Sequence, residues 1–466
     1  MVYSMDTCRI FVPCGALGLG RGANGISDEV FEDALALKPN IISCDAGSTD
    51  SGPYYLGSGN CKYSREAVKD DLRRILVGAD RLNIPVTIGS CGTCGVDKGV
   101  DWCEEIAREI CREEGLRPKK IAKIYTEQTA DVLKQKYREG KIHPLGNAPK
   151  IDETTFDKCS HIVALSGAEP FIEALSAGAD IVLCGRATDT AVIAAYPLMN
   201  GMPAGPTWHA SKILECGSAC VDRSAKSKTA GVVATINKDG FYLQAVGEGN
   251  RCSIYSVSAH MLYENSDPFR MYEPGLCFDV SESNYEQVED NKVYVTNSKY
   301  TKMPYTMKLE GSGLLGYQTI SMVGVRDYDV CRDPISWIDS LYERGQALLD
   351  RMGLDPASYS YKVKPYGYNA VSGVDVPEGY VPNEIGMLFQ ATASSQELAT
   401  KIAKVFNPLL LHLRHPSANG ELQPSFGFPF SPAEVPRGPL YGFMLNHVVE
   451  VDDPLELVRI EYVFTE

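Results

Sequence analysis

The stretch NIISCDAGSTDSGPYYLGSGNCKYSREAVKDDLRRILVGADRLNIPVTIG, residues 40–89, decides the fold. It begins with an apolar run (40–44), continues through a polar loop into a segment of helical period (64–82), and ends in a second apolar run (84–89). Two parallel strands cannot be joined by a tight turn and need a crossover, usually a helix. The stretch therefore predicts a βαβ unit.

The same alternation extends on both sides of this stretch. Six apolar runs, each followed by a segment of helical period, begin with RIFVP (9–13), NIISC (40–44), IPVTIG (84–89), KKIAKIY (119–125), HIVALS (161–166) and ADIVLCG (179–185). Ser27 and Ser64 stand where helix N-caps are expected. Residues 1–228 are therefore predicted to form an α/β domain with a parallel sheet and helices on both faces.

The pattern changes in the second half of the chain. From about residue 229 it shows short alternating runs such as GVVATI and FYLQAV, so 229–316 is predicted to be a β-rich insertion or second domain. Residues 317–466 show the order βαββαβ, which predicts a ferredoxin-like unit. Within it, the segment 417–439 is rich in Pro and Gly and is predicted to be a long loop acting as a lid or an interface.

Charge and composition exclude some classes of function. A chain of 466 residues is expected to form two or three domains, and its net charge of -15 repels nucleic acid and anionic lipid. The N-terminus lacks a basic region followed by an apolar one, and no segment has the roughly 18 apolar residues of a membrane span. We expect a cytoplasmic protein with no nucleic-acid or membrane partner.

The fifteen cysteines are odd in number and many lie in apolar runs, so they are expected to be reduced and buried. Cys91 and Cys94 form one CxxC motif, and Cys216 and Cys220 lie four residues apart. A single CxxC is half a zinc site at most. A redox pair and two small residues in a glycine turn are the alternatives.

Parallel sheets bind ligands at the carboxyl ends of their strands, so the residues that follow the six runs are the candidate site. Polar and conformationally special residues there are Asp45, Ser48, Thr49, Asp50, Tyr54, Tyr55, Ser90, Glu127, Ser166, Gly167, Glu169, Arg186, Thr188 and Asp189. Each could also belong to an ordinary turn or helix cap. Together they predict a polar substrate site.

Asp45 and Glu127 are the candidate acid and base, or the two ligands of a divalent metal ion. The alternative for Asp45 is a turn acceptor for Ser48 or Thr49, and the alternative for Glu127 is a first-turn residue facing a helix dipole.

Arg186 is expected to bind a substrate carboxylate, or else to pair with Asp189 or Asp45. His209 is a candidate proton carrier, although a lone histidine in a helix is more often structural. Tyr54 and Tyr55 are expected to close the pocket or donate a proton.

Gly20, Gly22 and Gly25 form a GxGxxG pattern before a predicted helix. The first of these glycines lies seven residues after the run that ends at Pro13, which is too far for the tight turn of a dinucleotide-binding fingerprint. A nicotinamide cofactor is therefore disfavoured.

Four segments together resemble the acyclic terpene utilisation (AtuA-like) family: CDAGSTDSGPYYLGSG, IPVTIGSCG, LSGAEPFIEALSAGADIVLCGRATDTAV and WHASKILECG. The resemblance extends through LEGSGLLGYQTISMVGVRD. It implies a bacterial role in the catabolism of carboxylic or branched acyl compounds, and a possible small partner protein in a hetero-oligomer.

These observations predict a catabolic lyase, specifically a hydro-lyase acting on a small hydroxy- or unsaturated carboxylate. The alternative is an acyl- or nucleotide-binding subunit of a hetero-oligomeric enzyme, and an NAD(P)-dependent oxidoreductase is the third option.

Overall fold

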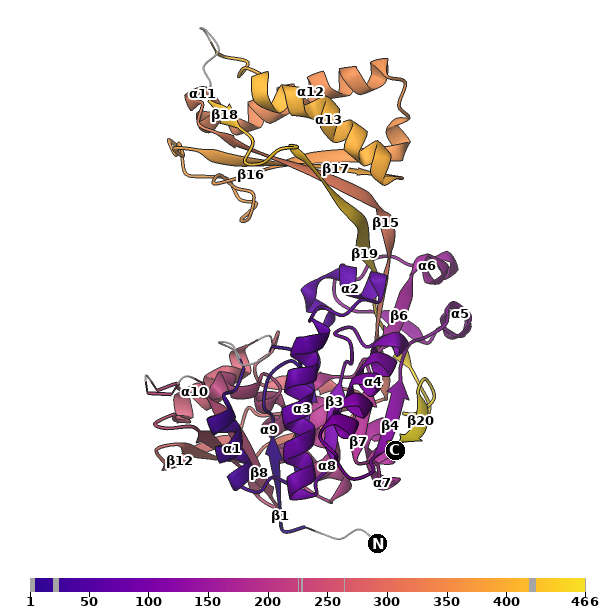
Figure 1. The fold of residues 1–466 in the computed structure, drawn as a ribbon, viewed down its shortest axis with the longest axis vertical. Coiled ribbons are helices and arrows are strands. Elements are labelled where there is room, and N and C mark those ends of the chain that lie inside the picture. Colours follow the sequence, from indigo (N-terminus) through magenta and orange to yellow (C-terminus); the bar gives the residue numbers. More distant parts are fainter. Residues whose placement is uncertain are drawn as a thin grey trace. The chain divides into compact units, whose positions relative to one another are not determined.

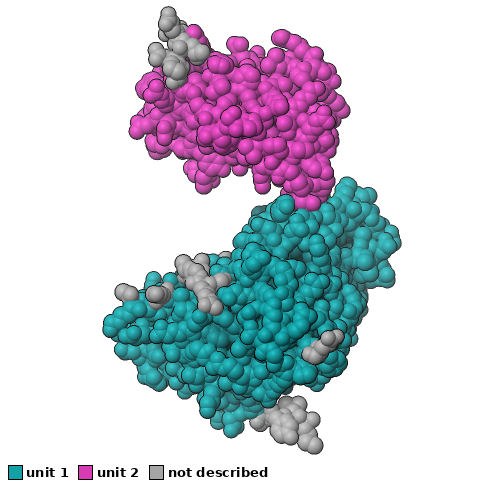
Figure 2. Space-filling view, viewed as in Figure 1, with its two compact units in different colours: residues 1–313, 443–466 teal, residues 314–442 magenta. Residues whose placement is uncertain are grey.

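A computed structural model describes residues 5–19, 25–224, 226–227, 229–263, 265–418 and 425–465. The chain forms two compact units, residues 1–313 with 443–466 and residues 314–442 (Figures 1 and 2). This division differs from the predicted boundaries at 228 and 316.

The described part of the first unit contains a sheet of ten strands. Its centre is parallel, in the order β1 (Thr7–Phe11), β2 (Ile41–Asp45), β3 (Val86–Gly89), β7 (Ile181–Cys184) and β4 (Lys120–Tyr125). Beside β1, antiparallel strands continue the sheet as β8 (Gly231–Asn237), β9 (Gly240–Val246), β13 (Lys292–Thr296) and β12 (Asn284–Glu289), and β20 (Arg459–Phe464) pairs with β4. The β-rich part is therefore not a separate domain, because its strands hydrogen-bond to the parallel strands.

Helices cover both faces of the sheet, as predicted. One core packs β2 and β3 against α1 (Asp28–Ala36), α3 (Arg65–Leu82) and α4 (Asp97–Glu113). The other packs β4 and β8 against α7 (Glu169–Ser176), α8 (Asp189–Met199) and α9 (Ala204–Leu214). Strand β7 serves both, with Ile181 and Leu183 in one core and Val182 and Cys184 in the other. The predicted N-caps are confirmed, since Ser27 accepts from the Val30 N–H and Ser64 from the Ala67 N–H.

The fifth predicted strand does not join the parallel sheet. β6 (His161–Ala164) pairs antiparallel with β15 (Thr306–Val325), with Ala164 opposite Leu309. There is no room for β6 between β4 and β7 in the parallel sheet, because these two strands pair directly, with Ile121 opposite Ile181. The loop after β6 still reaches the sheet edge, where Ser166 forms a parallel bridge with Ala187.

The second unit carries part of a seven-stranded sheet, in which β16 (Tyr359–Tyr366), β17 (Ile385–Ala393), β15 and β19 (Glu434–Glu450) are successive neighbours. Strand β15 continues across the predicted boundary at residue 316, and β18 (Phe426–Gly427) pairs with its end. Helices α12 (Pro334–Arg351) and α13 (Gln396–His412) pack on one face, around Trp337, Phe389 and Phe406, and α11 (Tyr328–Arg332) precedes them.

The predicted loop at 417–439 is partly wrong, because β18 lies within it and β19 begins at Glu434. Residues 419–424 of that segment lie outside the described residues.

Smaller elements complete the described structure. In the first unit they are the 3-10 helix η1 (Thr49–Ser51), α2 (Pro53–Ser58), α5 (Ala130–Arg138), β5 (Ile142–Pro144), α6 (Glu153–Lys158), η2 (Gly217–Cys220), α10 (Ile254–Ala259), η3 (His260–Leu262) and a sheet of β10 (Arg270–Glu273), β11 (Leu276–Asp279) and β14 (Lys299–Lys302). In the second unit η4 (Pro356–Ser358) precedes β16. Among the described residues, no helix combines the length and the apolar character needed to cross a membrane.

Candidate functional site

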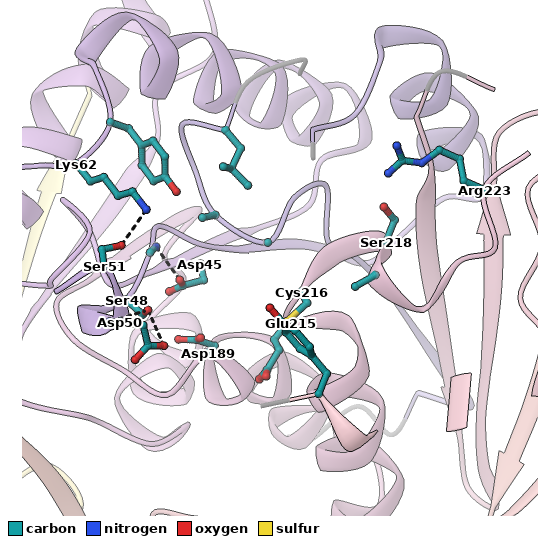
Figure 3. A pocket seen from close by; sticks show the side chains of 17 residues that line it. Asp45, Ser48, Asp50, Ser51, Lys62, Asp189, Glu215, Cys216, Ser218 and Arg223 are labelled. Atoms are coloured by element: carbon teal, nitrogen blue, oxygen red, sulfur yellow. Dashed lines mark hydrogen bonds between the residues drawn. The ribbon is translucent and has the colours of Figure 1, made fainter. Parts of the chain in front are cut away.

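Two cavities lie in the first unit, where loops follow the carboxyl ends of the parallel strands. The first has a volume of about 490 Å³ and the second about 480 Å³. Both are lined by Asp50, Asp189 and Glu215, so they adjoin one another. Figure 3 shows the first cavity, with Asp45 beside the residues shared with the second.

Asp45 is the last residue of β2 and is only 4% exposed. Its Oδ2 accepts the Gly47 N–H at 2.7 Å, so the predicted turn acceptor exists, with Gly47 as the donor. Gly47 has φ of +122°, and a Cβ there would meet the Thr93 side chain at 3.0 Å. This close turn holds the Asp45 carboxylate at the cavity wall.

The second oxygen of Asp45, Oδ1, is buried and has no hydrogen-bond partner among the described residues. Burial raises the pKa of Asp45 well above its ordinary value, the nearby Asp189 carboxylate raises it further, and Arg186 opposes both. Burial also raises the pKa of Asp189. A carboxyl in this position holds a proton at a higher pH than a carboxyl in water.

Arg186 follows β7, lines the second cavity and forms hydrogen bonds with side chains from several elements. Its Nε donates to Glu310 Oε2 at 3.1 Å, and its Nη1 donates to Ser90 Oγ at 2.9 Å. The predicted pair with Asp189 is present at 3.4 Å. Burial disfavours the Glu310 charge, but Arg186 and Lys308 outweigh burial and lower the pKa of Glu310 to about 2. Most donors of Arg186 are therefore already used by the protein.

Glu215 follows α9 and supplies a third buried carboxylate. It accepts hydrogen bonds from Lys212 Nζ and, at 2.8 Å, from Thr190 Oγ1. Burial raises the pKa of Glu215 to about 7, against the opposing charge of Lys212 and with a contribution from Asp189. A group with such a pKa can both give and take a proton near neutral pH.

A fourth buried carboxylate, Glu273 of β10, lines the second cavity. It accepts from Thr188 Oγ1 at 2.5 Å, and burial raises its pKa to about 7.

Two cationic side chains line the first cavity with these acids. Lys62 Nζ donates to Ser51 Oγ at 2.9 Å, and its neighbour Tyr63 also lines the cavity. In Figure 3, Lys62 and Arg223 lie on different sides of the cavity, with Asp45, Asp189 and Glu215 between them in the view. The cavity thus combines acids that can hold protons with cations that can bind an anion.

Glu127 is not brought to Asp45. Its Oε1 lies 2.6 Å from His161 Nδ1, and its Oε2 accepts the Asp97 N–H at 2.9 Å. The sheet order explains this, because β3 and β7 lie between β2 and β4. Neighbouring strands are about 4.8 Å apart, so these two strand ends are separated by roughly 14 Å. A metal ion shared by Asp45 and Glu127 is incompatible with this order.

His209 lies on α9 but lines neither cavity. Its Nδ1 is 2.8 Å from Ser298 Oγ, its ring packs against Phe241, and burial lowers its pKa to about 3. The structure therefore favours the structural alternative, a neutral packed histidine.

Other predicted residues support the loops or lie elsewhere. Tyr54 and Tyr55 on α2 contact each other edge to face, and Glu169 accepts from Tyr305 Oη at 2.6 Å beside Gly167. The two cavities are not lined by Tyr54, Tyr55, Gly167 or Glu169, nor by the buried Thr49, Ser90 and Ser166. The predicted residues that do line them are Asp45, Ser48, Asp50, Arg186, Thr188 and Asp189.

The cysteine motifs do not form a metal centre. All fifteen cysteines are free, and Cys91 and Cys94 contact different groups, the carbonyls of Ile88 and of Tyr55. In the described ranges, no three His, Cys, Asp or Glu side chains are grouped so that they could hold a metal ion. Of the GxGxxG pattern, Gly20 and Gly22 lie outside the described residues.

Six residues of the site were not predicted from the sequence: Lys62, Lys212, Glu215, Arg223, Glu273 and Glu310. A signal existed for two of them, because Lys212 and Glu215 lie three residues apart in an otherwise apolar helical segment, which places them on one side of a helix. Glu273 follows no parallel strand and could not be found by a search of strand ends.

The model of a family described as acyclic terpene utilisation family protein AtuA matches residues 62–424. No curated protein and no solved structure matches the chain.

Proposed function

The chain belongs to the acyclic terpene utilisation (AtuA) family, and we propose that it is a catabolic hydro-lyase acting on a small hydroxy- or unsaturated carboxylate. The observation that supports this proposal is the first cavity, where the buried Asp45, Asp189 and Glu215 lie with Lys62 and Arg223.

Elimination of water needs a base for the proton on carbon, an acid for the departing hydroxyl, and a cation for the carboxylate. In the proposed reaction, the Glu215 carboxylate takes a proton from the carbon next to the substrate carboxylate. Protonated Asp45 gives its proton to the leaving hydroxyl. A carbon–carbon double bond forms, the carbon–oxygen bond breaks, and water leaves. Transfer of the proton from Glu215 to Asp45 then restores both groups.

The test is proton exchange in deuterated water. Purified protein is incubated with hydroxy acids and their unsaturated products, and proton NMR follows deuterium entering the carbon next to the carboxylate. Asp45→Asn and Glu215→Gln should each lower the rate by about 100-fold or more, the usual contribution of a general acid or base. Wild-type rates in both variants would exclude these roles.

The proposal requires no nicotinamide cofactor, because loss of water involves no net oxidation. The acid step uses Asp45 in its protonated form, so the proposed reaction places no divalent ion on this carboxyl. Elemental analysis of protein purified without chelators tests for such an ion.

A second candidate is a substrate-binding subunit of an oligomeric enzyme. Exposed apolar side chains favour it. Tyr263 lines the first cavity and is 53% exposed, and Leu262 on η3 and Tyr255 on the neighbouring α10 are 68% and 80% exposed. Such a surface suits contact with another chain, whether a second copy or a small separate partner. In that case turnover should appear only when the protein is purified together with its partner.

For the second unit we propose the ferredoxin-like class. Its βαββαβ order supports this, together with a sheet in which the first and third strands are adjacent and both helices lie on one face.

A further inference from the structure

Most side chains that line the first cavity are polar, and the rings of Tyr63 and Tyr263 and the Cys216 thiol also form part of its wall. Carboxylate and hydroxyl groups line it at Asp45, Ser48, Asp50, Ser51, Asp189 and Glu215. Its aliphatic side chains are limited, among the described lining residues, to Ala16, Leu19 and Ala219. A hydrocarbon chain entering here would remove water from carboxylates without replacing the lost hydrogen bonds, which is unfavourable.

Asp50 lies where its carboxylate can accept hydrogen bonds from a bound molecule. It is exposed, it lines both cavities, and its Oδ2 accepts from Ser48 Oγ at 3.0 Å. A carboxylate has two oxygens and about four acceptor positions, so it can accept further hydroxyl groups. Neutral aliphatic groups offer nothing to these acceptors.

Lys62 is placed to bind the charged end of the molecule. Its ammonium donates to Ser51 Oγ, and an ammonium has three donors. Arg223 gives the cavity a second cationic residue. An anion is needed to match these cations, and hydroxyl groups are needed to match the acids.

We propose that the substrate is a polyhydroxylated carboxylic acid, with its carboxylate at Lys62 and its hydroxyl groups at Asp50 and Asp189. This inference rests on the proposed function, because it names the substrate class of that site. It separates this chain from an enzyme for branched, apolar acids, which is the class that the family name suggests. The raised pKa values of Asp45 and Asp189 fit this class, since a protonated carboxyl can donate to a hydroxyl as well as accept from it.

The test compares two acids that differ only in their hydroxyl groups. Calorimetry measures binding of gluconate and of hexanoate, which share chain length and carboxylate, and of dimethyloctanoate as a branched apolar acid. Gluconate should bind at least about tenfold more tightly than hexanoate, because a single hydrogen bond to a charged group increases the affinity by about tenfold or more. Equal or tighter binding of hexanoate or dimethyloctanoate, or no binding of gluconate, would overturn the proposal.

Variants separate the two ends of the substrate. Asp50→Ala should weaken the binding of gluconate by about tenfold and leave the binding of hexanoate unchanged. Lys62→Gln should weaken the binding of both acids. Asp50→Asn should recover part of the preference, because an amide oxygen also accepts. Asp33→Ala on α1, which lines neither cavity, is the control and should change nothing. Equal loss of both acids in Asp50→Ala contradicts the assigned role.

The outcome is distinct from that of the proposed function. Tight gluconate binding without exchange of carbon-bound protons in any hydroxy acid would support the substrate class and remove the hydro-lyase. Turnover of a simple hydroxy acid, with no preference for gluconate, would support the hydro-lyase and contradict the proposed substrate class.

Discussion

Glu215 is buried beside Lys212, and its protonation should be visible in stability. Its pKa rises from an ordinary 4.5 to about 7, so between these values the folded protein binds more protons than the unfolded chain. The free energy of unfolding should therefore fall as pH rises through this range. Glu215 contributes about 3 kcal/mol, fully present below pH 4.5 and lost above pH 7.

Urea unfolding at a series of pH values measures this slope. Glu215→Gln should reduce the dependence of the free energy of unfolding on pH. Part of this dependence should remain, because burial also raises the pKa of Glu273. Glu113→Gln, at the exposed end of α4, serves as the control. An unchanged slope in Glu215→Gln would show that Glu215 is ionised throughout.

At the scale of elements, the turn after β3 supports the site through Gly95. Gly95 has φ of +70°, and a Cβ there would lie 2.2 Å from the backbone nitrogen of Arg186. Gly115 is the matched control, because its φ is +61° and nothing lies within 4 Å of the same position. Gly115→Ala should cost about 1–2 kcal/mol, the cost of the left-handed backbone alone.

Gly95→Ala should cost several kcal/mol more than its control, since one of two packed backbone segments must move. The comparison is made by urea unfolding, or by the yield of folded protein if Gly95→Ala does not accumulate. Equal costs for the two variants would mean that this turn has freedom to shift.

At the scale of the molecule, the two units have separate cores. Phe406 is fully buried in the core around α12 and α13, and Leu72 is fully buried among α1, α3 and α4. Phe406→Ala should lower the stability of the second unit by about 3–5 kcal/mol, and Leu72→Ala that of the first by about 2–5 kcal/mol. Calorimetry should show each variant shifting a different transition. A common shift of one transition would show that the units unfold together.

The local elements and one edge of the site could be predicted from residue patterns alone. Apolar runs alternating with helical segments specified the α/β class, and Asp45 could be placed at the cavity because a buried strand ends there. These features depend on the period of the chain and on its nearest neighbours, which a single sequence displays directly.

Which side chains meet depends on long-range contacts that are visible only in the folded chain. Strand order separated Glu127 from Asp45, and β6 paired with a strand more than a hundred residues later instead of joining the parallel sheet. Glu215 and Glu273 reached the cavity from a helix end and a distant hairpin. Hydrophobic period marks which residues are buried but not which strand lies beside which, and the pKa of each acid depends on neighbours that only folding supplies.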